Sequence, residues 1–215
     1  MAKIISLSQI KRPMPPEEIL SLTGRRIRPA PDLMERTFKT FIEPDGLLYN
    51  EEHPHLIDAD IGMLWCSETN SRQMNAIVGE AEIPAFRGGK WQKVRQEQQL
   101  EEWFGEVPDF LITIDANFAT AADNASFCAT IEHELFHCGQ DRDGFGMPKF
   151  NRMTGKPVFA IRGHDCEEFV GVVARYGIGS AAGKTAELVH AANKGPLFGE
   201  AHVNGACGTC DRKVA

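Results

Sequence analysis

Long hydrophobic runs are absent from the sequence. No apolar stretch approaches the length of about 18 residues that a membrane-spanning helix requires, and the first residues, Met1–Ser6, do not form the hydrophobic core of a signal peptide. Internal repeats and low-complexity segments are absent as well. We therefore expect a cytoplasmic protein without a membrane partner.

Positively charged residues are fewer than negatively charged ones. The 23 lysines and arginines are outnumbered by 30 aspartates and glutamates, which gives a formal net charge of −7. This balance provides no global electrostatic reason to expect nucleic acid or an anionic membrane as a partner. Basic residues cluster at Arg25–Arg28 and at Lys90, Lys93 and Arg95, so a nucleic-acid-associated protein would have to use one of these clusters.

The six cysteines of the 215 residues do not indicate a disulfide framework, because cysteines in a cytoplasmic chain usually stay reduced or bind metal. Cys207 and Cys210 form a CxxC pair near the C-terminus, which is half of a zinc-binding knuckle. A redox role is disfavoured because no βαβ pattern surrounds the pair. We predict a candidate second metal site at this pair, completed by His202, by another cysteine or by a second chain. Two reduced cysteines without a ligand are the alternative.

One five-residue stretch, His133–His137 with the sequence HELFH, carries the clearest chemical signal. Residues four apart lie one above the other on a helix face, so the imidazoles of His133 and His137 can bind the same metal ion. Glu134 lies beside the metal, which is the position of a general base that takes a proton from a metal-bound water. The motif HExxH predicts the chemistry of zinc hydrolases, above all of peptidases.

The flanking sequence indicates that this stretch lies on a packed helix; a solvated surface helix with two histidines is the alternative. Asp123 and Asn124 are suitable N-cap residues, and Gly139 is typical of a helix C-terminus. Four apolar residues fall on one face of the helix and should pack into a core: they are Phe127, Ile131, Leu135 and Cys138. The histidines are expected on the flank of this stripe, with Glu134 towards the buried side.

Three candidates for a third metal ligand lie close together in the sequence: His164, Asp165 and Glu168. Imidazole is a commoner zinc ligand than a lone aspartate, which favours His164, and Gly163 allows the backbone to turn sharply before it. Asp165 and Glu168 have the spacing of a helix capping box. Either could also hold a metal-bound histidine or bind the metal itself, so the choice stays open with His164 favoured.

Hydrophobic periodicity predicts the other elements of the chain, whose 42% hydrophobic and 25% charged residues are ordinary for a globular domain with a sizeable core. Helices are expected at residues 32–43, 90–104, 163–176 and 186–193, and strands at 60–66, 76–84, 109–115 and 158–161. The strand at 109–115 should feed directly into the HExxH helix. His53 and His55 flank Pro54 in a loop and are expected to be ordinary surface residues.

The HExxH block His133–Cys138, followed by Gly163–Phe169 and Ala174–Gly177, resembles the putative phage metallopeptidase family. The resemblance covers about residues 30–177. It implies a small α+β fold of the minimal zincin-like type, similar in outline to SprT-like zinc peptidases. In such a fold, a small mixed sheet packs on the HExxH helix and on a second helix near the third ligand.

Motif and resemblance together predict a zinc-dependent metallopeptidase of phage or prophage type, with Zn²⁺ held by His133, His137 and His164. The zinc would lower the pKa of a bound water, and Glu134 would accept its proton as the hydroxide attacks a peptide carbonyl and then pass it to the leaving amine. The zinc would also stabilise the developing oxyanion. The expected partner is a protein or peptide substrate.

The alternative function is a zinc-containing protein-interaction or nucleic-acid-associated module without proteolytic activity. Glu134 weighs against it, because a purely structural zinc site does not need a general base. In either case we divide the chain into an N-terminal arm (1–30), a zincin-like metallopeptidase domain (31–177), and a C-terminal helix and CxxC tail packed on the same domain (178–215).

Overall fold

The computed structural model of the chain describes residues 11–21, 26–72, 75–166, 183–198, 201 and 206–207. Its strands are β1 (Ile27–Pro29), β2 (Ile61–Cys66), β3 (Ser71–Arg72), β4 (Asn75–Glu82), β5 (Phe110–Asp115), β6 (Cys138–Gln140), β7 (Phe159–Ile161) and β8 (Ala206–Cys207). Its α-helices are α1 (Glu17–Leu20), α2 (Pro31–Thr37), α3 (Lys90–Phe104), α4 (Ala116–Ala121), α5 (Asn124–His137) and α7 (Lys184–Lys194). A π-helix (Phe38–Ile42) extends α2, and a 3-10 helix covers Pro54–Asp58.

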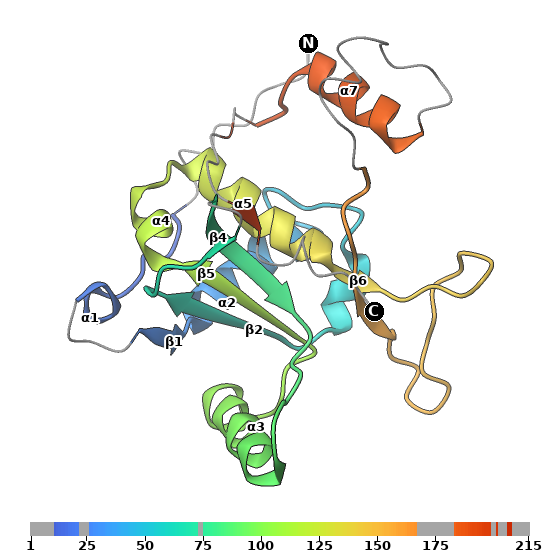
Figure 1. Cartoon of the computed structure of the whole chain (residues 1–215). Helices are drawn as coiled ribbons and strands as arrows, with labels where there is room; N and C mark the ends of the chain where they lie inside the picture. The colour runs from blue at the N-terminus through green and yellow to red at the C-terminus, as the bar shows by residue number, and fades with distance from the viewer. Residues whose placement is uncertain are drawn as a thin grey trace.

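A mixed β-sheet forms the centre of the described part (Figure 1). Its strand order is β1-β2-β5-β4-β3, and β8 pairs with β4. The pairs β2–β5 and β4–β8 are parallel, whereas β1–β2, β4–β5 and β3–β4 are antiparallel. A mixed sheet combined with these helices confirms the predicted α+β class.

The two faces of the sheet pack against different helices. Phe110, Ile112 and Ile114 of β5 belong to the main core, to which α2, α4 and α5 contribute. Leu111, which points to the opposite face because side chains alternate along a strand, joins a smaller cluster with Leu100 of α3. Figure 1 shows α3 on the far side of the sheet from α5. The helix that carries the HExxH motif therefore lies on the main-core face.

Local sequence explains why α5 forms where it does. The side chain of Asp123 accepts hydrogen bonds from the backbone nitrogen of Ser126 (2.9 Å) and from its hydroxyl (2.7 Å), which caps the helix N-terminus. The predicted apolar stripe is buried, with exposed fractions of 4% for Phe127, 1% for Ile131 and 0% for Leu135. The helix thus presents one face to the core and fixes the side chains on its flank.

After α5 the chain continues directly into β6, which pairs antiparallel with β7. Between the two strands, isolated bridges join Arg142 to Pro148 and Phe150 to Pro157. The intervening residues form an arm that projects from the body of the molecule in Figure 1. This β6–β7 arm brings the chain back to the C-terminal end of α5.

Most of the predicted elements are confirmed in the described residues. The helix expected at 90–104 is α3, and the strands expected at 60–66, 76–84, 109–115 and 158–161 correspond to β2, β4, β5 and β7. The helix expected at 186–193 lies within α7. Residues 163–166 are not helical, and the remainder of the helix predicted at 163–176 lies outside the described residues.

The helix expected at 32–43 is present, as α2 followed from Phe38 by a π-helix. One detail of the prediction is wrong. The strand at 109–115 does not feed directly into the HExxH helix, because α4 intervenes. The side chain of Asp115 accepts hydrogen bonds from the backbone nitrogens of Asn117 (2.7 Å) and Phe118 (2.9 Å), and this cap starts the extra helix.

The N-terminal residues contribute to the fold. Ile19 is 1% exposed in the main core, and β1 pairs with β2 at the edge of the sheet. The division of the chain into arm, domain and tail stays a prediction. No helix in the described part of the chain is both long enough and apolar enough to cross a membrane.

Candidate metal centre

His133 and His137 meet on one flank of α5, as their spacing predicts. Their Nε2 atoms are 3.2 Å apart, and the rings are arranged edge to face with centroids 4.9 Å apart. His137 is buried at 2% exposure, whereas His133 is half-buried. Two ring nitrogens therefore converge on one point at the end of the helix.

The backbone of Arg162 fixes the orientation of His137. Nδ1 of His137 donates a hydrogen bond to the carbonyl oxygen of Arg162 (2.6 Å), and the nitrogen of Arg162 donates to the carbonyl of His137 (2.9 Å). A carbonyl oxygen can only accept, so the proton is on Nδ1, and in the neutral ring Nε2 offers its lone pair towards His133. Such a bond from the second ring nitrogen is typical of a metal-binding histidine.

The electrostatic environment of His137 is mixed. Burial lowers the pKa of His137, but hydrogen bonds to Cys207 and to the carbonyl of Arg162 outweigh this effect, so that the pKa lies above its usual value. A metal ion would replace the proton on Nε2, because only the neutral imidazole binds metal.

Of the candidate third ligands, the structure brings His164 to the centre. Its Nε2 lies 3.4 Å from Nε2 of His133, and its ring centroid lies 5.1 Å from that of His133 and 5.2 Å from that of His137. Asp165 accepts a hydrogen bond of 2.7 Å from Nη2 of Arg162, which lowers the pKa of its carboxyl group. Glu168 lies outside the described residues.

Cys207 also lies at this centre, which the sequence did not indicate. Its Sγ is 3.3 Å from Nε2 of His137, and the thiol donates to Oε2 of Glu134 at 3.6 Å. The donor atoms of His133, His137 and Cys207 all lie within 4.8 Å of one another. Cys210 lies outside the described residues, so a separate metal site at the CxxC pair stays a prediction. Cys207, the described cysteine of the pair, lies at the centre formed by His133 and His137.

The separations between these atoms fit a tetrahedral metal site. Two nitrogens that are each about 2.1 Å from one tetrahedral zinc ion lie about 3.4 Å apart, and a nitrogen and a sulfur lie about 3.6 Å apart. Nε2 of His133 is 3.2 Å from Nε2 of His137 and 3.4 Å from Nε2 of His164, and Sγ of Cys207 is 3.3 Å from Nε2 of His137. His133, His137 and Cys207 form the group whose donor atoms are all close to one another. Imidazole and thiol are ligands that zinc prefers. The residues present therefore fit a bound zinc ion.

Glu134 is buried between α5 and β4, with 1% of its surface exposed. A Cβ atom at Gly79 of β4 would lie 2.6 Å from Oε1 of Glu134 and 3.0 Å from its Cγ. A side chain at position 79 would therefore displace the carboxylate. A glycine inside a strand often marks such a close approach, and this is the signal in the sequence that could have indicated the role of Gly79.

The geometry agrees with the comparison of the sequence with known families. The family described as "Putative phage metallopeptidase" matches residues 34–193. The chain belongs to this family. No curated protein and no solved structure matches it.

Family membership indicates a metallopeptidase, and a metallopeptidase requires a metal. The prediction made from the paired motif blocks is confirmed at the level of the family. The cluster of His133, His137 and Cys207 lies where a metal could bind.

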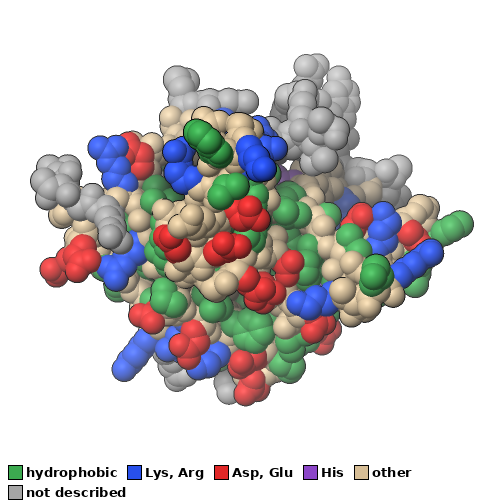
Figure 2. Space-filling view, turned by 90° about the horizontal axis from the view of Figure 1, so that it is seen from below, with side chains coloured by type: hydrophobic (Ala, Val, Ile, Leu, Met, Phe, Trp, Pro, Cys, Tyr) green, Lys and Arg blue, Asp and Glu red, His purple; other side chains and the backbone are tan. Residues whose placement is uncertain are grey.

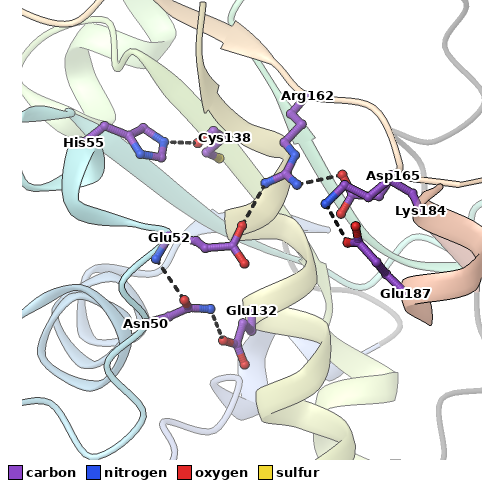
Figure 3. A network of polar contacts seen from close by, with 9 residues as sticks. All are labelled: Asn50, Glu52, His55, Glu132, Cys138, Arg162, Asp165, Lys184 and Glu187. Atoms are coloured by element: carbon purple, nitrogen blue, oxygen red, sulfur yellow. Dashed lines mark hydrogen bonds and ion pairs between the residues drawn. The ribbon is translucent and has the colours of Figure 1, made fainter. Parts of the chain in front are cut away.

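Around the centre, Arg162 connects the segment after β7 with the loop between the π-helix and the 3-10 helix. Figure 3 shows its guanidinium group between Glu52 (3.5 Å) and Asp165 (2.7 Å). The group also lies over the ring of Phe136, 5.5 Å from the ring centroid. Exposed ion pairs stabilise a fold only weakly, so we assign to this arrangement the role of holding the Arg162 backbone beside His137.

A second polar contact holds the start of the motif. Nδ2 of Asn50 donates to Oε1 of Glu132 at 2.8 Å, and Oδ1 of Asn50 accepts from the backbone nitrogen of Glu52 at 2.9 Å (Figure 3). Burial raises the pKa of Glu132. The loop before the 3-10 helix is thus joined to α5 directly next to His133.

The prediction that His53 and His55 are ordinary surface residues is wrong for both. His53 is 1% exposed, and its ring packs edge to face on Phe136 with centroids 4.7 Å apart. Nε2 of His55 donates to the carbonyl of Cys138 at 2.8 Å. Burial lowers the pKa of both, and that of His53 falls to about 4. These contacts join residues more than 80 positions apart, which no local pattern indicates.

The metal centre opens to the surface. A pocket of about 210 Å³ is lined by His133, His137, His164, Glu52, Phe136, Arg162, Gly163 and Asp165. A larger cleft of about 1060 Å³ shares Glu52, Phe136 and Arg162 with this pocket and continues along the β6–β7 arm. A ligand of the size of a peptide segment could therefore approach the metal-binding nitrogens from this side.

Proposed function

We propose that the chain is a zinc-dependent peptidase that hydrolyses peptide bonds with Glu134 as general base. The observation that supports this most directly is the position of Glu134. The carboxylate is buried at 1% exposure, and its Oε2 lies 3.6 Å from the same sulfur of Cys207 that is 3.3 Å from Nε2 of His137. Abstraction of a proton from the attacking water is the task that its position suits.

We propose a separate role for each residue of the site. His133, His137 and His164 would hold the zinc ion, and when bound it would supply an activated water and polarise the peptide carbonyl. Glu134 would accept a proton from the attacking water and return it to the leaving amine. The carbonyl of Arg162 would keep His137 in the tautomer that presents Nε2.

The substrate that we propose is a protein or peptide in an extended conformation. The 210 Å³ pocket and the adjoining 1060 Å³ cleft provide an open path past Phe136 and Arg162. Acidic and basic side chains both line this cleft, among them Glu52, Asp141, Arg142 and Lys184. The lining thus has no excess of one charge that would select a nucleic acid.

A zinc-containing module without proteolytic activity is the second candidate. Cys207 favours it, because a metal with four protein ligands has no position for water, as in structural zinc sites. A nucleic-acid-associated module is not favoured by α3, where Lys90, Lys93 and Arg95 share the helix with Glu97, Glu101 and Glu102. On the face seen from the side of α3, acidic, basic and apolar side chains are interspersed (Figure 2).

Replacement of Glu134 tests the proposed function. Glu134→Gln keeps the size of the side chain but removes its basicity, so the metal content should stay the same while hydrolysis of an unfolded test protein such as casein falls by about 10² to 10⁴-fold. His133→Ala should lose the metal itself, as measured by elemental analysis. Measurable cleavage that is equal in wild type and Glu134→Gln would remove Glu134 from the mechanism.

A further inference from the structure

Cys207 reaches the metal centre through a defined contact of the backbone. Its strand β8 (dark red in Figure 1) pairs parallel with β4, and Cys207 is opposite Gly79. The other side of Gly79 pairs with Ile114 of β5. β8 therefore covers the outer edge of β4 at the point where that strand touches Glu134.

The thiol of Cys207 contacts both functional parts of the site. Sγ is 3.3 Å from Nε2 of His137, close to the separation of two ligands on one zinc ion, and it is 3.6 Å from Oε2 of Glu134. Cys207 shares one group of donor atoms with His133 and His137, and His164 lies beside it, 3.4 Å from His133. If the three histidines bind zinc, the sulfur would be a fourth ligand, and it would take the position that a catalytic zinc site keeps open for water.

We propose that Cys207 is a metal ligand and that β8 is an inhibitory strand, which holds the peptidase in a latent state until the strand leaves the edge of β4. This inference rests on the proposed function, because it assigns a regulation to the same site. The thiol loses its proton when it binds the metal. When β8 leaves, a water molecule takes the place of the sulfur, and the carboxylate of Glu134 becomes available to it.

Two features indicate a removable strand and not a permanent structural ligand. The described part of β8 has two residues, and its register with β4 is irregular between Ile77 and Gly79; a short, irregular edge pairing of this kind can open locally. The carboxylate of Glu134 and the space at Gly79 are retained beneath it, although a structural zinc site needs neither. The edge of β4 that β8 covers is the kind of surface to which an extended peptide adds as a strand.

X-ray absorption at the zinc edge of the full-length protein tests the ligand assignment without an activity assay. The wild-type spectrum should contain one sulfur at about 2.3 Å together with nitrogen neighbours at about 2.1 Å. In Cys207→Ala the sulfur should be replaced by an oxygen or nitrogen neighbour, and about one zinc per chain should remain. Iodoacetamide should modify Cys207 at least tenfold faster after a chelator has removed the zinc.

Two control variants accompany this measurement. Cys66→Ser changes a half-buried cysteine on β2, and Cys210→Ser changes the other cysteine of the CxxC pair; both should keep the sulfur signal of the wild type. A wild-type spectrum without sulfur would overturn the proposal, as would loss of the sulfur in Cys210→Ser but not in Cys207→Ala. Loss of zinc from Cys207→Ala would show a structural ligand and would overturn the latent state.

Hydrolysis separates this inference from the proposed function. Cys207→Ala should cleave unfolded casein at least tenfold faster than the wild type, and Cys207→Ala combined with Glu134→Gln should abolish the gain. If the wild type cleaves casein and Cys207→Ala cleaves it no faster, the proposal of an inhibitory strand is wrong, whereas the proposed peptidase function stands. If none of these chains cleaves while the sulfur signal behaves as expected, the proposed function fails and the ligand assignment stands.

Discussion

The ring nitrogens of the buried histidines meet different partners, and these partners decide what each residue can do. His137 donates from Nδ1 to the carbonyl of Arg162, which leaves Nε2 for a metal. The ring of His53 packs on Phe136, and in the described part of the chain its Nε2 has no hydrogen-bond partner. A charge on such a ring is unfavourable. Protonation of His53 in acid should therefore destabilise the fold.

The depressed pKa of His53 predicts a loss of stability in mild acid. Between its value in the fold, about 4, and its ordinary value of 6.5, the unfolded chain binds a proton that the folded chain does not. The contribution of His53 to stability is therefore fully present above pH 6.5 and is lost as the pH falls from 6.5 to 4, and it amounts to about 3 kcal/mol. The free energy of unfolding in urea, measured across this range, checks the prediction.

Variants isolate the contribution of His53. His53→Phe removes the titrating ring and should flatten the pH dependence, because no proton is then bound on unfolding at this position. His190→Gln, on the exposed surface of α7, should keep the wild-type slope. An unchanged slope in His53→Phe would contradict the prediction.

The contact between α5 and β4 shows how two elements position the carboxylate that we propose as the general base. The helix brings Glu134 to the strand, and the strand accepts it because residue 79 has no side chain. On the outer edge of β4, the same residue pairs with Cys207. The placement of the carboxylate therefore depends on the close approach of a helix to a strand and not on the motif alone.

Gly79→Ala should impair hydrolysis while the metal is retained. The new Cβ would lie 2.6 Å from Oε1 of Glu134, so the carboxylate must move, and a displacement of this size can cost about 10²-fold in rate. The rate and the metal content would be measured both in the wild-type chain and in Cys207→Ala. Gly62→Ala on β2 is the control, because its Cβ would lie 3.0 Å from the ring of Phe104 and not near Glu134. The hydrolysis rate of this variant should stay within a few-fold of that of the chain into which it is introduced. A wild-type rate in Gly79→Ala would contradict this role.

The metal centre joins segments that are far apart in the chain. His133 and His137 come from α5, His164 follows β7, and Cys207 is on β8. A metal ion bound to all of them would connect the HExxH helix to both later segments. Because the unfolded chain does not offer these ligands together, metal binding should stabilise the folded chain.

Removal of the metal should lower the melting temperature. At a free zinc concentration about 100 times the dissociation constant, binding adds about 2.7 kcal/mol, which corresponds to about 5 to 10 °C for a chain of this size. Differential scanning calorimetry with and without a chelator measures the shift. His133→Ala should show no shift, and a wild type that is equally stable in chelator would contradict the prediction.

Much of the architecture followed from short-range patterns in the sequence. Short runs of strand-forming and apolar residues bounded by turns predicted β2, β4 and β5, and the helical spacing of apolar residues predicted α3 and the buried face of α5. Asp123 and Asn124 were expected as caps from their residue type, and the structure shows Asp123 capping α5 through Ser126, three positions away. The convergence of His133 and His137 followed from the four-residue spacing on a helix. Each of these features depends on residues within about two turns of one another, where covalent geometry alone sets the distances.

The features that complete the site arise from contacts between distant parts of the chain. The pairing of Cys207 with Gly79, the carbonyl of Arg162 at His137 and the burial of His53 against Phe136 were not indicated by any local pattern. The terminal cysteine pair was interpreted as a separate site for this reason. The packing of the whole chain determines which strand pairs with the edge of β4 and which loop covers α5. Sequence distance does not determine it, because closing a loop costs almost the same free energy for many alternative partners. The HExxH motif therefore defined the chemistry, whereas strand pairing and helix packing decided which further residues reach it.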